Sequence, residues 1–322
     1  METRRLGATP FEITPIGLGC MQFSGPGLVA RFYNPLAQDT ISAVVAAARA
    51  GGINWFDTAE MYGRGHSERA LTTALREHSV APGEVVVATK WAPLLRTAAN
   101  IERTIETRLA SLQGFPIDLH QIHMPVGSFS SRDRQVETMA RLCQAGKIAA
   151  VGVSNFSARQ MERASELLRS HGLALAANQV QISLLHRNIE RDGVLDAARR
   201  LGITLIAYSP LKSGLLTGKF HDDRALARSL PWVRRLLGGF SDRQQSRTEP
   251  LINELRAIGR AYGVSAGQVA LSWLITFYGD TVVAIPGASQ PHHADQNAAA
   301  MQLRLTAREL ERIDEVSRAA GQ

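Results

Sequence analysis

Four polar side chains stand at the ends of short apolar runs, at spacings that allow them to meet. They are Asp57, Tyr62, Lys90 and His123. Asp57, Lys90 and His123 each follow such a run directly, and Tyr62 comes five residues after Asp57. Taken singly, Asp57 could cap a helix, Lys90 could be a surface charge and His123 a rim histidine. As a set they point to a catalytic site.

The set suits protonation of an oxygen that gains negative charge. A tyrosine with a pKa of about 10 is a weak acid near neutrality. A neighbouring Lys90 ammonium should lower the pKa of Tyr62, and Asp57 could pair with that ammonium. His123 could hydrogen-bond the substrate oxygen. Hydride addition to an aldehyde or ketone creates such an oxygen, and because no side chain donates hydride, a nicotinamide cofactor is required.

Alternating strands and helices must position these residues. After a hairpin over residues 4–13, strands are predicted at 15–19, 53–56, 85–89, 117–122, 148–153, 175–180, 203–207 and 281–285. Helices are predicted at 38–50, 67–77, 100–113, 133–145, 157–170, 191–200, 250–261, 265–277, 291–299 and 306–319, with Asn100 as the cap of its helix. Such units form an open doubly wound sheet or a closed barrel. Eight units at near-equal spacing favour a (β/α)₈ TIM barrel with an N-terminal β-hairpin and extra C-terminal helices, in one domain over residues 1–322.

A barrel places its chemistry at the carboxyl ends of its strands. Those ends carry Met21, Asp57, Lys90, His123, Ser154, Asn155, Gln179, Tyr208, Ser209 and residues 287–289. Met21, Trp91, Met124 and Phe156 could line a substrate pocket or pack the rim, and the sequence favours neither interpretation.

Composition narrows the function classes. The 322 residues carry a net charge of +7, yet Lys and Arg are scattered among acidic residues, so nucleic-acid binding is not expected. The sequence has no apolar run long enough for a membrane span and no apolar stretch after its first residues, which predicts a cytoplasmic protein without a membrane partner. Cys20 and Cys143 are expected to be free thiols, and no metal is expected, since His292 and His293 lack nearby carboxylate or cysteine ligands.

The usual dinucleotide and nucleotide motifs are missing. Residues 17–22 lack the third glycine of G-x-G-x-x-G, and residues 214–220 match a P-loop only loosely. The barrel alternative binds phosphate with its late loops and a short helix N-terminus. Residues 285–291 and Lys219 fit that role.

Seven motifs along nearly the whole chain resemble the aldo-keto reductase superfamily. They are NWFDTAEMYG (54–63), ATK (88–90), DLHQIH (118–123), GK followed by GVSNF (146–147 and 152–156), NQ (178–179), YSPL with LTGK (208–211 and 216–219), and IPGAS (285–289). The resemblance is closer to the bacterial and channel-β-subunit-like branch than to aldose reductase, because Gly287 stands where the latter carries Lys.

The resemblance implies carbonyl reduction with NADPH, with NADH as a possible substitute. Tyr62 would be the acid, tuned by Asp57 and Lys90, with His123 orienting the carbonyl. The cofactor would be held by Met21, Asp57, Ser154, Asn155, Gln179, Tyr208, Ser209, Leu211, Lys219, Gly287, Ser289, His293, Gln296 and Asn297. Relatives often have Arg or Gln at the position of His293 and Glu at that of Gln296, so selection of the cofactor's 2′-phosphate should be modest here.

Two other functions fit the sequence less well. A cofactor-sensing binding protein like the channel β-subunits would turn over slowly, and the intact tetrad favours an enzyme over it. A metal-dependent hydrolase would need ligands at several strand ends, where they are missing. The substrate is expected to be a small carbonyl compound selected by loops near residues 23–32, 91–96, 125–131 and 221–245, and the oligomeric state is left open.

Overall fold

A computed structural model describes residues 2–27, 34–230 and 240–321 of the chain. Parts of two predicted substrate loops, residues 28–32 and 231–239, lie outside this range. In the described part, one parallel sheet has the strand order β10-β9-β8-β7-β6-β5-β4-β3. Its strands are β3 (Leu18–Gly19), β4 (Trp55–Asp57), β5 (Val86–Trp91), β6 (Leu119–Ile122), β7 (Ala150–Ser154), β8 (Leu175–Gln181), β9 (Thr204–Tyr208) and β10 (Val282–Ala284).

The first and last strands of this sheet meet and close it into a barrel. Ile16 bridges Ala284, and Gly19 bridges Gly287, both in parallel. The Gly17 N–H donates to the Ala284 carbonyl at 2.8 Å, and the Ala284 N–H donates to the Pro15 carbonyl at 2.9 Å. The TIM barrel predicted from the alternating pattern is therefore confirmed.

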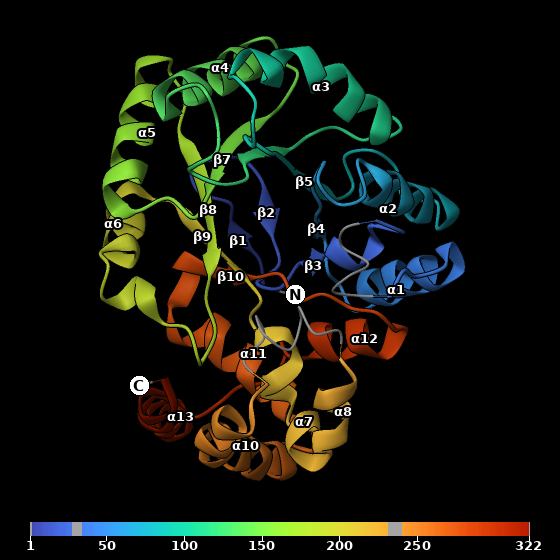
Figure 1. The fold of residues 1–322 in the computed structure, drawn as a ribbon, viewed down its shortest axis with the longest axis vertical. Coiled ribbons are helices and arrows are strands. Elements are labelled where there is room, and N and C mark those ends of the chain that lie inside the picture. The colour runs from blue at the N-terminus through green and yellow to red at the C-terminus, as the bar shows by residue number, and fades with distance from the viewer. Residues whose placement is uncertain (1, 28–33, 231–239, 322) are drawn as a thin grey trace.

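A small antiparallel hairpin sits against one end of the barrel. It consists of β1 (Arg4–Arg5) and β2 (Glu12–Ile13), and Figure 1 shows it within the ring of strands. Its Leu6 and Ile13 are fully buried and share a cluster with Trp55 and Leu119, whose strands form the barrel wall. The hairpin thus contributes apolar side chains to the barrel interior, as a packed lumen requires.

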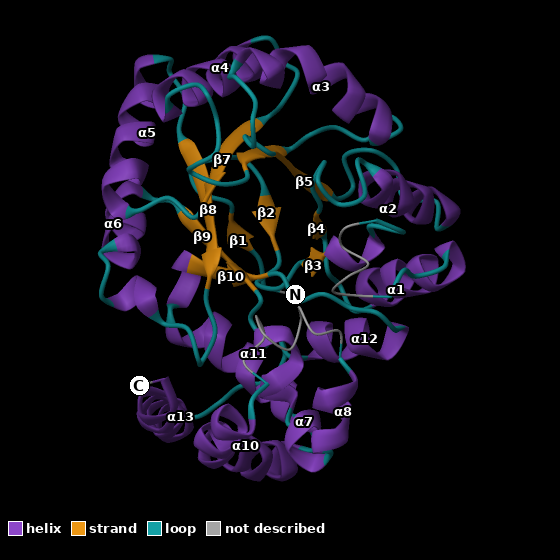
Figure 2. Ribbon diagram, viewed as in Figure 1, coloured by secondary structure: helices purple, strands orange, loops and turns teal. Residues whose placement is uncertain are grey.

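Helices surround the strands in Figures 1 and 2. They are α1 (Gln38–Ala50), α2 (His66–Glu77), α3 (Ala99–Ser111), α4 (Arg132–Gln144), α5 (Ala158–Ser170), α6 (Val194–Leu201), α7 (Lys219–Asp222), α8 (Arg224–Ser229), α10 (Asp242–Tyr262), α11 (Ala266–Phe277), α12 (Pro291–Ala299) and α13 (Ala307–Gly321). Short 3₁₀ turns are η1 (Met21–Phe23), η3 (Asn188–Glu190), η4 (Lys212–Thr217) and η5 (Gly279–Thr281).

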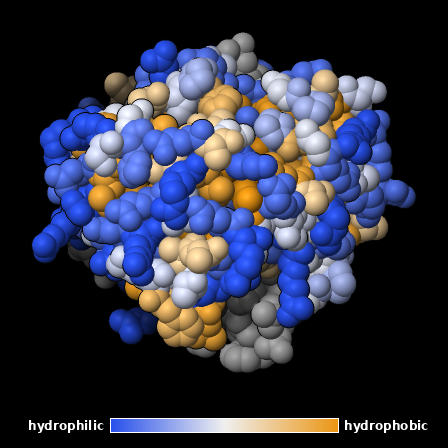
Figure 3. All heavy atoms as spheres, turned by 90° about the horizontal axis from the view of Figure 1, so that it is seen from above, coloured by the Kyte–Doolittle hydropathy of each residue, from blue (hydrophilic) through white to orange (hydrophobic). Residues whose placement is uncertain are grey.

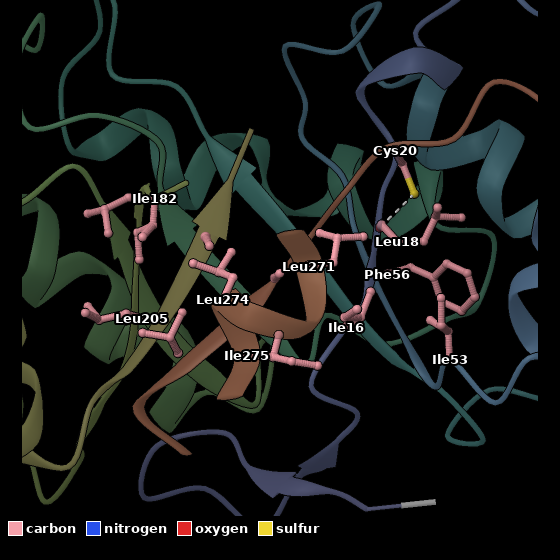
Figure 4. Close-up of a cluster of buried hydrophobic side chains, with 14 of the residues drawn as sticks. Ile16, Leu18, Cys20, Ile53, Phe56, Ile182, Leu205, Leu271, Leu274 and Ile275 are labelled. Carbon is pink, nitrogen blue, oxygen red and sulfur yellow. Dashed lines mark hydrogen bonds between the residues drawn. The ribbon is translucent and has the colours of Figure 1, made fainter. Parts of the chain in front are cut away.

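The larger apolar core lies between the barrel and these helices. Figure 4 shows part of it, where Leu271, Leu274 and Ile275 of α11 lie near Ile16 and Leu205 of the barrel wall. All five side chains are buried. This core anchors the helices, so that the strand ends are held in a fixed arrangement.

Several predicted boundaries were wrong, and side-chain contacts explain two of them. Asn100 is not a helix cap: it lies within the first turn of α3, and its side chain accepts a hydrogen bond from the Trp91 indole at 3.0 Å. Helix α10 begins at Asp242 rather than at Pro250, because the Ser241 side chain caps it by accepting from the Gln244 N–H at 3.2 Å. Two short helices, α7 and α8, also occupy part of the predicted long loop.

The outer surface is mainly hydrophilic on the face shown in Figure 3, with hydrophobic residues scattered between. None of the helices in the described ranges is both long enough and apolar enough to cross a bilayer. Within the same ranges, no group of three or more His, Cys, Asp or Glu side chains is arranged to hold a metal ion.

Candidate active site

A buried ion pair occupies the carboxyl end of neighbouring strands β4 and β5. Lys90 Nζ lies 2.5 Å from Asp57 Oδ1 and donates a second hydrogen bond to the Thr58 carbonyl at 2.8 Å. Both side chains are at most 2% exposed. Burial opposes the charge on Lys90, but the Asp57 carboxylate and Tyr62 outweigh it and raise the pKa of Lys90. Lys90 is therefore a fixed cation at the mouth of the barrel.

Tyr62 reaches this cation from the turn that follows β4. Its hydroxyl lies 3.5 Å from Lys90 Nζ, and Lys90 Nζ lies 5.0 Å from the centre of its ring. The expectation that Lys90 makes this phenol unusually acidic is wrong for the protein without ligands. Burial raises the pKa of Tyr62 and outweighs the opposing effect of Lys90. The phenol is consequently held in its protonated form.

His123 packs against the Tyr62 ring. The two rings are edge to face, with centroids 5.8 Å apart. Burial, and then the Lys90 charge, lower the pKa of His123 to about 3, so the imidazole is neutral near pH 7. Its Nδ1 is buried and has no hydrogen-bond partner in the described structure. All four predicted tetrad residues thus meet at one place.

One residue of this site was missed in the sequence. Gln121 of β6 is fully buried, and its Nε2 donates to Asp57 Oδ2 at 3.0 Å. Gln179 of β8 donates to the same oxygen at 2.9 Å. The only sequence signal was a lone amide within the apolar run 117–122, which does not reveal what the amide contacts.

A second chain of polar groups runs along the ends of β7, β8 and β9. Ser154 Oγ donates to the Gln179 carbonyl at 2.9 Å, and Asn155 Nδ2 donates to Ser154 Oγ at 3.0 Å. The Tyr208 hydroxyl donates to Asn155 Oδ1 at 3.1 Å. Asn155 adopts a left-handed backbone with φ 58°, a conformation uncommon outside glycine. The four predicted carboxamide and ring contacts are therefore contiguous, and Gln179 links them to Asp57.

The segment after β9 has an unusual backbone. Ser209, Lys212 and Ser213 all have positive φ, at 51°, 47° and 54°, and Gly214 follows at 92°. Positive φ at non-glycine residues is strained and concentrates at ligand-binding segments. Successive amide groups in such turns can form an anion-binding concavity. Leu211 is half-buried within this segment.

The remaining predicted cofactor residues lie around the start of α12. Ser289 Oγ is 3.4 Å from His293 Nδ1, and Asn297 Nδ2 is 3.5 Å from the Gly287 carbonyl. Burial and the charges of His292 and Lys219 lower the pKa of His293, so Lys219 lies on the same side of the mouth. Gln296 is exposed on α12, and Met21 is half-buried in η1.

Of the four undecided apolar residues, two belong to the core. Trp91 and Phe156 are 1% and 2% exposed and pack in the large cluster between barrel and helices. Met21 and Met124 are half-buried. Trp91 and Phe156 are therefore packing residues in this structure.

Comparison with known proteins identifies the family of this chain. The model of the aldo/keto reductase family matches residues 15–318. The chain belongs to the aldo/keto reductase family. Members are nicotinamide-dependent enzymes, so this aldo/keto reductase is an oxidoreductase.

Individual relatives agree. An uncharacterized oxidoreductase of Mycobacterium tuberculosis is 37% identical over 310 residues, covering 96% of this chain and 90% of the relative. The chloroplastic pyridoxal reductase of Arabidopsis thaliana is 32% identical over 310 residues, covering 92% and 81%. Among solved structures, a glycerol dehydrogenase from Gluconobacter oxydans superimposes with a TM-score of 0.81 at 29% identity, covering 99% of this chain and 96% of that one.

Proposed function

We propose that this aldo/keto reductase reduces an aldehyde or ketone to an alcohol, with NADPH as the preferred cofactor. One observation carries the proposal: the Tyr62 phenol, the Lys90 ammonium and the His123 imidazole converge at the carboxyl end of the strands. That end is where barrel enzymes build their active sites. When bound, the cofactor supplies the hydride that none of these side chains can supply.

Side chains of this protein then orient and protonate the carbonyl oxygen. The neutral His123 imidazole donates a hydrogen bond to the carbonyl oxygen and orients it beside Tyr62. Tyr62 gives its proton to that oxygen as negative charge develops. Lys90 lies 3.5 Å away and stabilises the phenolate left behind, while Asp57 keeps Lys90 in place.

The polar groups along the late strands fit a dinucleotide. Ser154, Asn155 and Gln179 offer hydroxyl and amide groups suited to a carboxamide, and the Tyr208 ring could cover the nicotinamide. The left-handed backbone over residues 212–214 offers amides to the phosphates, with Lys219 nearby. We assign Ser289, His293, Gln296 and Asn297 to the adenosine end.

The rim suggests which carbonyl compounds enter. Four exposed apolar side chains, at 46–80% exposure, follow β5 and β6: Leu94, Leu95, Val126 and Phe129. The two loops are joined, since the Leu95 N–H donates to the Gly127 carbonyl and the Phe129 N–H to the Arg96 carbonyl. Exposed apolar clusters mark binding surfaces. We therefore propose that the substrate carries an apolar alkyl or aryl group.

A cofactor-oxidation screen tests the function. NADPH consumption would be followed with a panel of aldehydes, quinones and ketones, including pyridoxal because one relative is a pyridoxal reductase. The same panel would be repeated with NADH. Turnover of at least one aldehyde or ketone is expected, and consumption by none, despite cofactor binding, would contradict the proposal.

A further inference from the structure

The Asp57 carboxylate is held from two directions. Oδ1 accepts from Lys90, and Oδ2 accepts from the side-chain amides of Gln121 and Gln179 at 3.0 and 2.9 Å. The two amides also touch each other, with Gln179 Nε2 at 3.4 Å from Gln121 Oε1. Three donors on one fully buried carboxylate fix its position.

Gln121 reaches Asp57 across an intervening strand. Lys90 on β5 is paired in register with Gln121 on β6, and Gln121 is paired with Gly152 on β7. Residues in register on neighbouring parallel strands point to the same side of the sheet. Gln121 therefore enters the barrel interior beside Lys90, where an apolar residue would be the ordinary filler.

Gly152 provides the space for this side chain. A Cβ built on Gly152 would lie 2.9 Å from Gln121 Cγ and 3.1 Å from a methyl carbon of Leu119. Contacts under 3.0 Å force a neighbour to move. Gly152 has no positive φ, so its lack of a side chain matters here for room and not for backbone conformation.

We infer that Gln121 is a positioning residue for the reaction: it holds the Asp57 carboxylate so that Lys90 faces Tyr62. This inference rests on the proposed carbonyl reduction. Without the Gln121 amide, Asp57 Oδ2 keeps only Gln179, the residue also assigned to the nicotinamide carboxamide. Gln121 thereby gives Asp57 Oδ2 a donor that is not also assigned to the cofactor.

The test compares Gln121→Leu with the wild type and with Gln245→Leu as a matched control. Gln245 is also buried, and among the described residues its amide donates to the Phe240 carbonyl, not to a carboxylate. For Gln121→Leu we expect kcat to fall about tenfold, the scale of one hydrogen bond to a charged group. The KM of the carbonyl compound and the affinity for NADPH should stay within about twofold, since Gln121 is assigned to neither ligand.

A second variant keeps Gln121 but displaces it. Gly152→Ala should lower kcat in the same direction, and in the Gln121→Leu background it should cause no further loss. Unchanged kcat in a folded Gln121→Leu variant would overturn the inference. So would a loss expressed mainly as weaker NADPH binding, or full additivity with Gly152→Ala. The wild type and Tyr62→Phe distinguish the two levels. If the wild type consumes NADPH with none of the carbonyl compounds, the proposed function fails, and if Tyr62→Phe retains full activity, the proton-donor role of Tyr62 fails. If only Gln121→Leu retains full activity, the positioning role fails alone.

Discussion

Lys90 Nζ lies 3.5 Å from the phenol oxygen of Tyr62, close enough to stabilise a phenolate but not enough to create one in the resting protein. Burial dominates the resting state and keeps the phenol protonated. Once Tyr62 has given its proton to a carbonyl oxygen, the fixed positive charge of Lys90 stabilises the phenolate that remains. The pair thus suits an acid that must keep its proton until the substrate reacts.

The ion pair behind that acid should matter for stability as well as for turnover. In Lys90→Met, the Asp57 carboxylate would remain buried with two amide donors but no cation. We expect the free energy of unfolding to fall by about 3–5 kcal/mol and turnover to be lost. Urea unfolding measures the first effect. The double variant Lys90→Met with Asp57→Leu should recover part of that stability, and a double variant less stable than Lys90→Met would contradict this account.

His120 should make the protein sensitive to acid. It is 1% exposed, both ring nitrogens lack partners in the described structure, and burial followed by the Arg108 charge lowers its pKa from 6.5 to about 3. Its neutral form is favoured by folding, so its contribution to stability is present above pH 6.5 and is lost as pH falls toward 3. The loss is about 1.4 kcal/mol per pH unit.

Two buried carboxyl groups have the opposite dependence on pH. The test therefore compares the free energies of unfolding of His120→Leu and the wild type. Burial raises the pKa of Asp118 to about 6 and also raises the pKa of Glu68. The variant His120→Leu removes only the histidine. Its advantage over the wild type in free energy of unfolding should grow as pH falls from 6.5 to 4. Parallel stability curves for the two proteins over that range would show that His120 does not titrate as described.

The exposed apolar side chains after β5 and β6 should select substrates by the length of their alkyl chains. Leu95→Ser and Phe129→Ser remove two side chains that are 80% and 73% exposed, so folding should be unaffected. We expect kcat/KM for a long straight-chain aldehyde to fall about five- to tenfold and that for a short one to change little. Tyr262→Ser, at the end of α10 and outside the predicted substrate loops, is the control, since Tyr262 is 39% exposed. Equal losses for short and long aldehydes, or a change in oligomeric state instead, would show that the rim serves another purpose.

The adenosine end should discriminate only modestly between NADPH and NADH. His293 is there in place of an Arg, and its pKa is lowered, so it carries little charge near pH 7. His293→Arg should raise the NADPH-to-NADH ratio of kcat/KM about tenfold, through a charge-assisted bond to the 2′-phosphate. His292→Arg, one position away on α12, is the matched control. An unchanged ratio in His293→Arg would place the 2′-phosphate elsewhere.

The sequence predicted most of the elements because their ends carry local signals. Helix α12 begins at Pro291 and α1 ends before Gly51, and both were predicted with their observed bounds. The role of Asn100 was wrong, because the Trp91 indole that it contacts comes from the preceding strand. The proposal of one domain over residues 1–322 rests on the bridges Ile16–Ala284 and Gly19–Gly287, which join segments from opposite ends of the chain.

The proximity of the candidate residues was predicted well where residue type and position at a strand end were sufficient. The pKa shift of Tyr62 was predicted poorly because it depends on burial. Asp57, Lys90 and His123 stand at the ends of strands, so the barrel alone brings them together. The sign of the Tyr62 pKa shift depends on how deeply the phenol is buried, which no spacing reveals. Gln121 was missed because its partner Asp57 lies two strands away, in a register that the sequence does not display.

Tyr62→Phe tests the central claim most directly, because it removes only the phenol oxygen. NADPH binding would be followed by the change in cofactor emission, and NADPH oxidation by a carbonyl substrate would be measured alongside. We expect the variant to bind NADPH as the wild type does and to turn over about 10²–10⁴-fold more slowly. Turnover at the wild-type rate by a correctly folded, NADPH-binding variant would show that Tyr62 is not the proton donor.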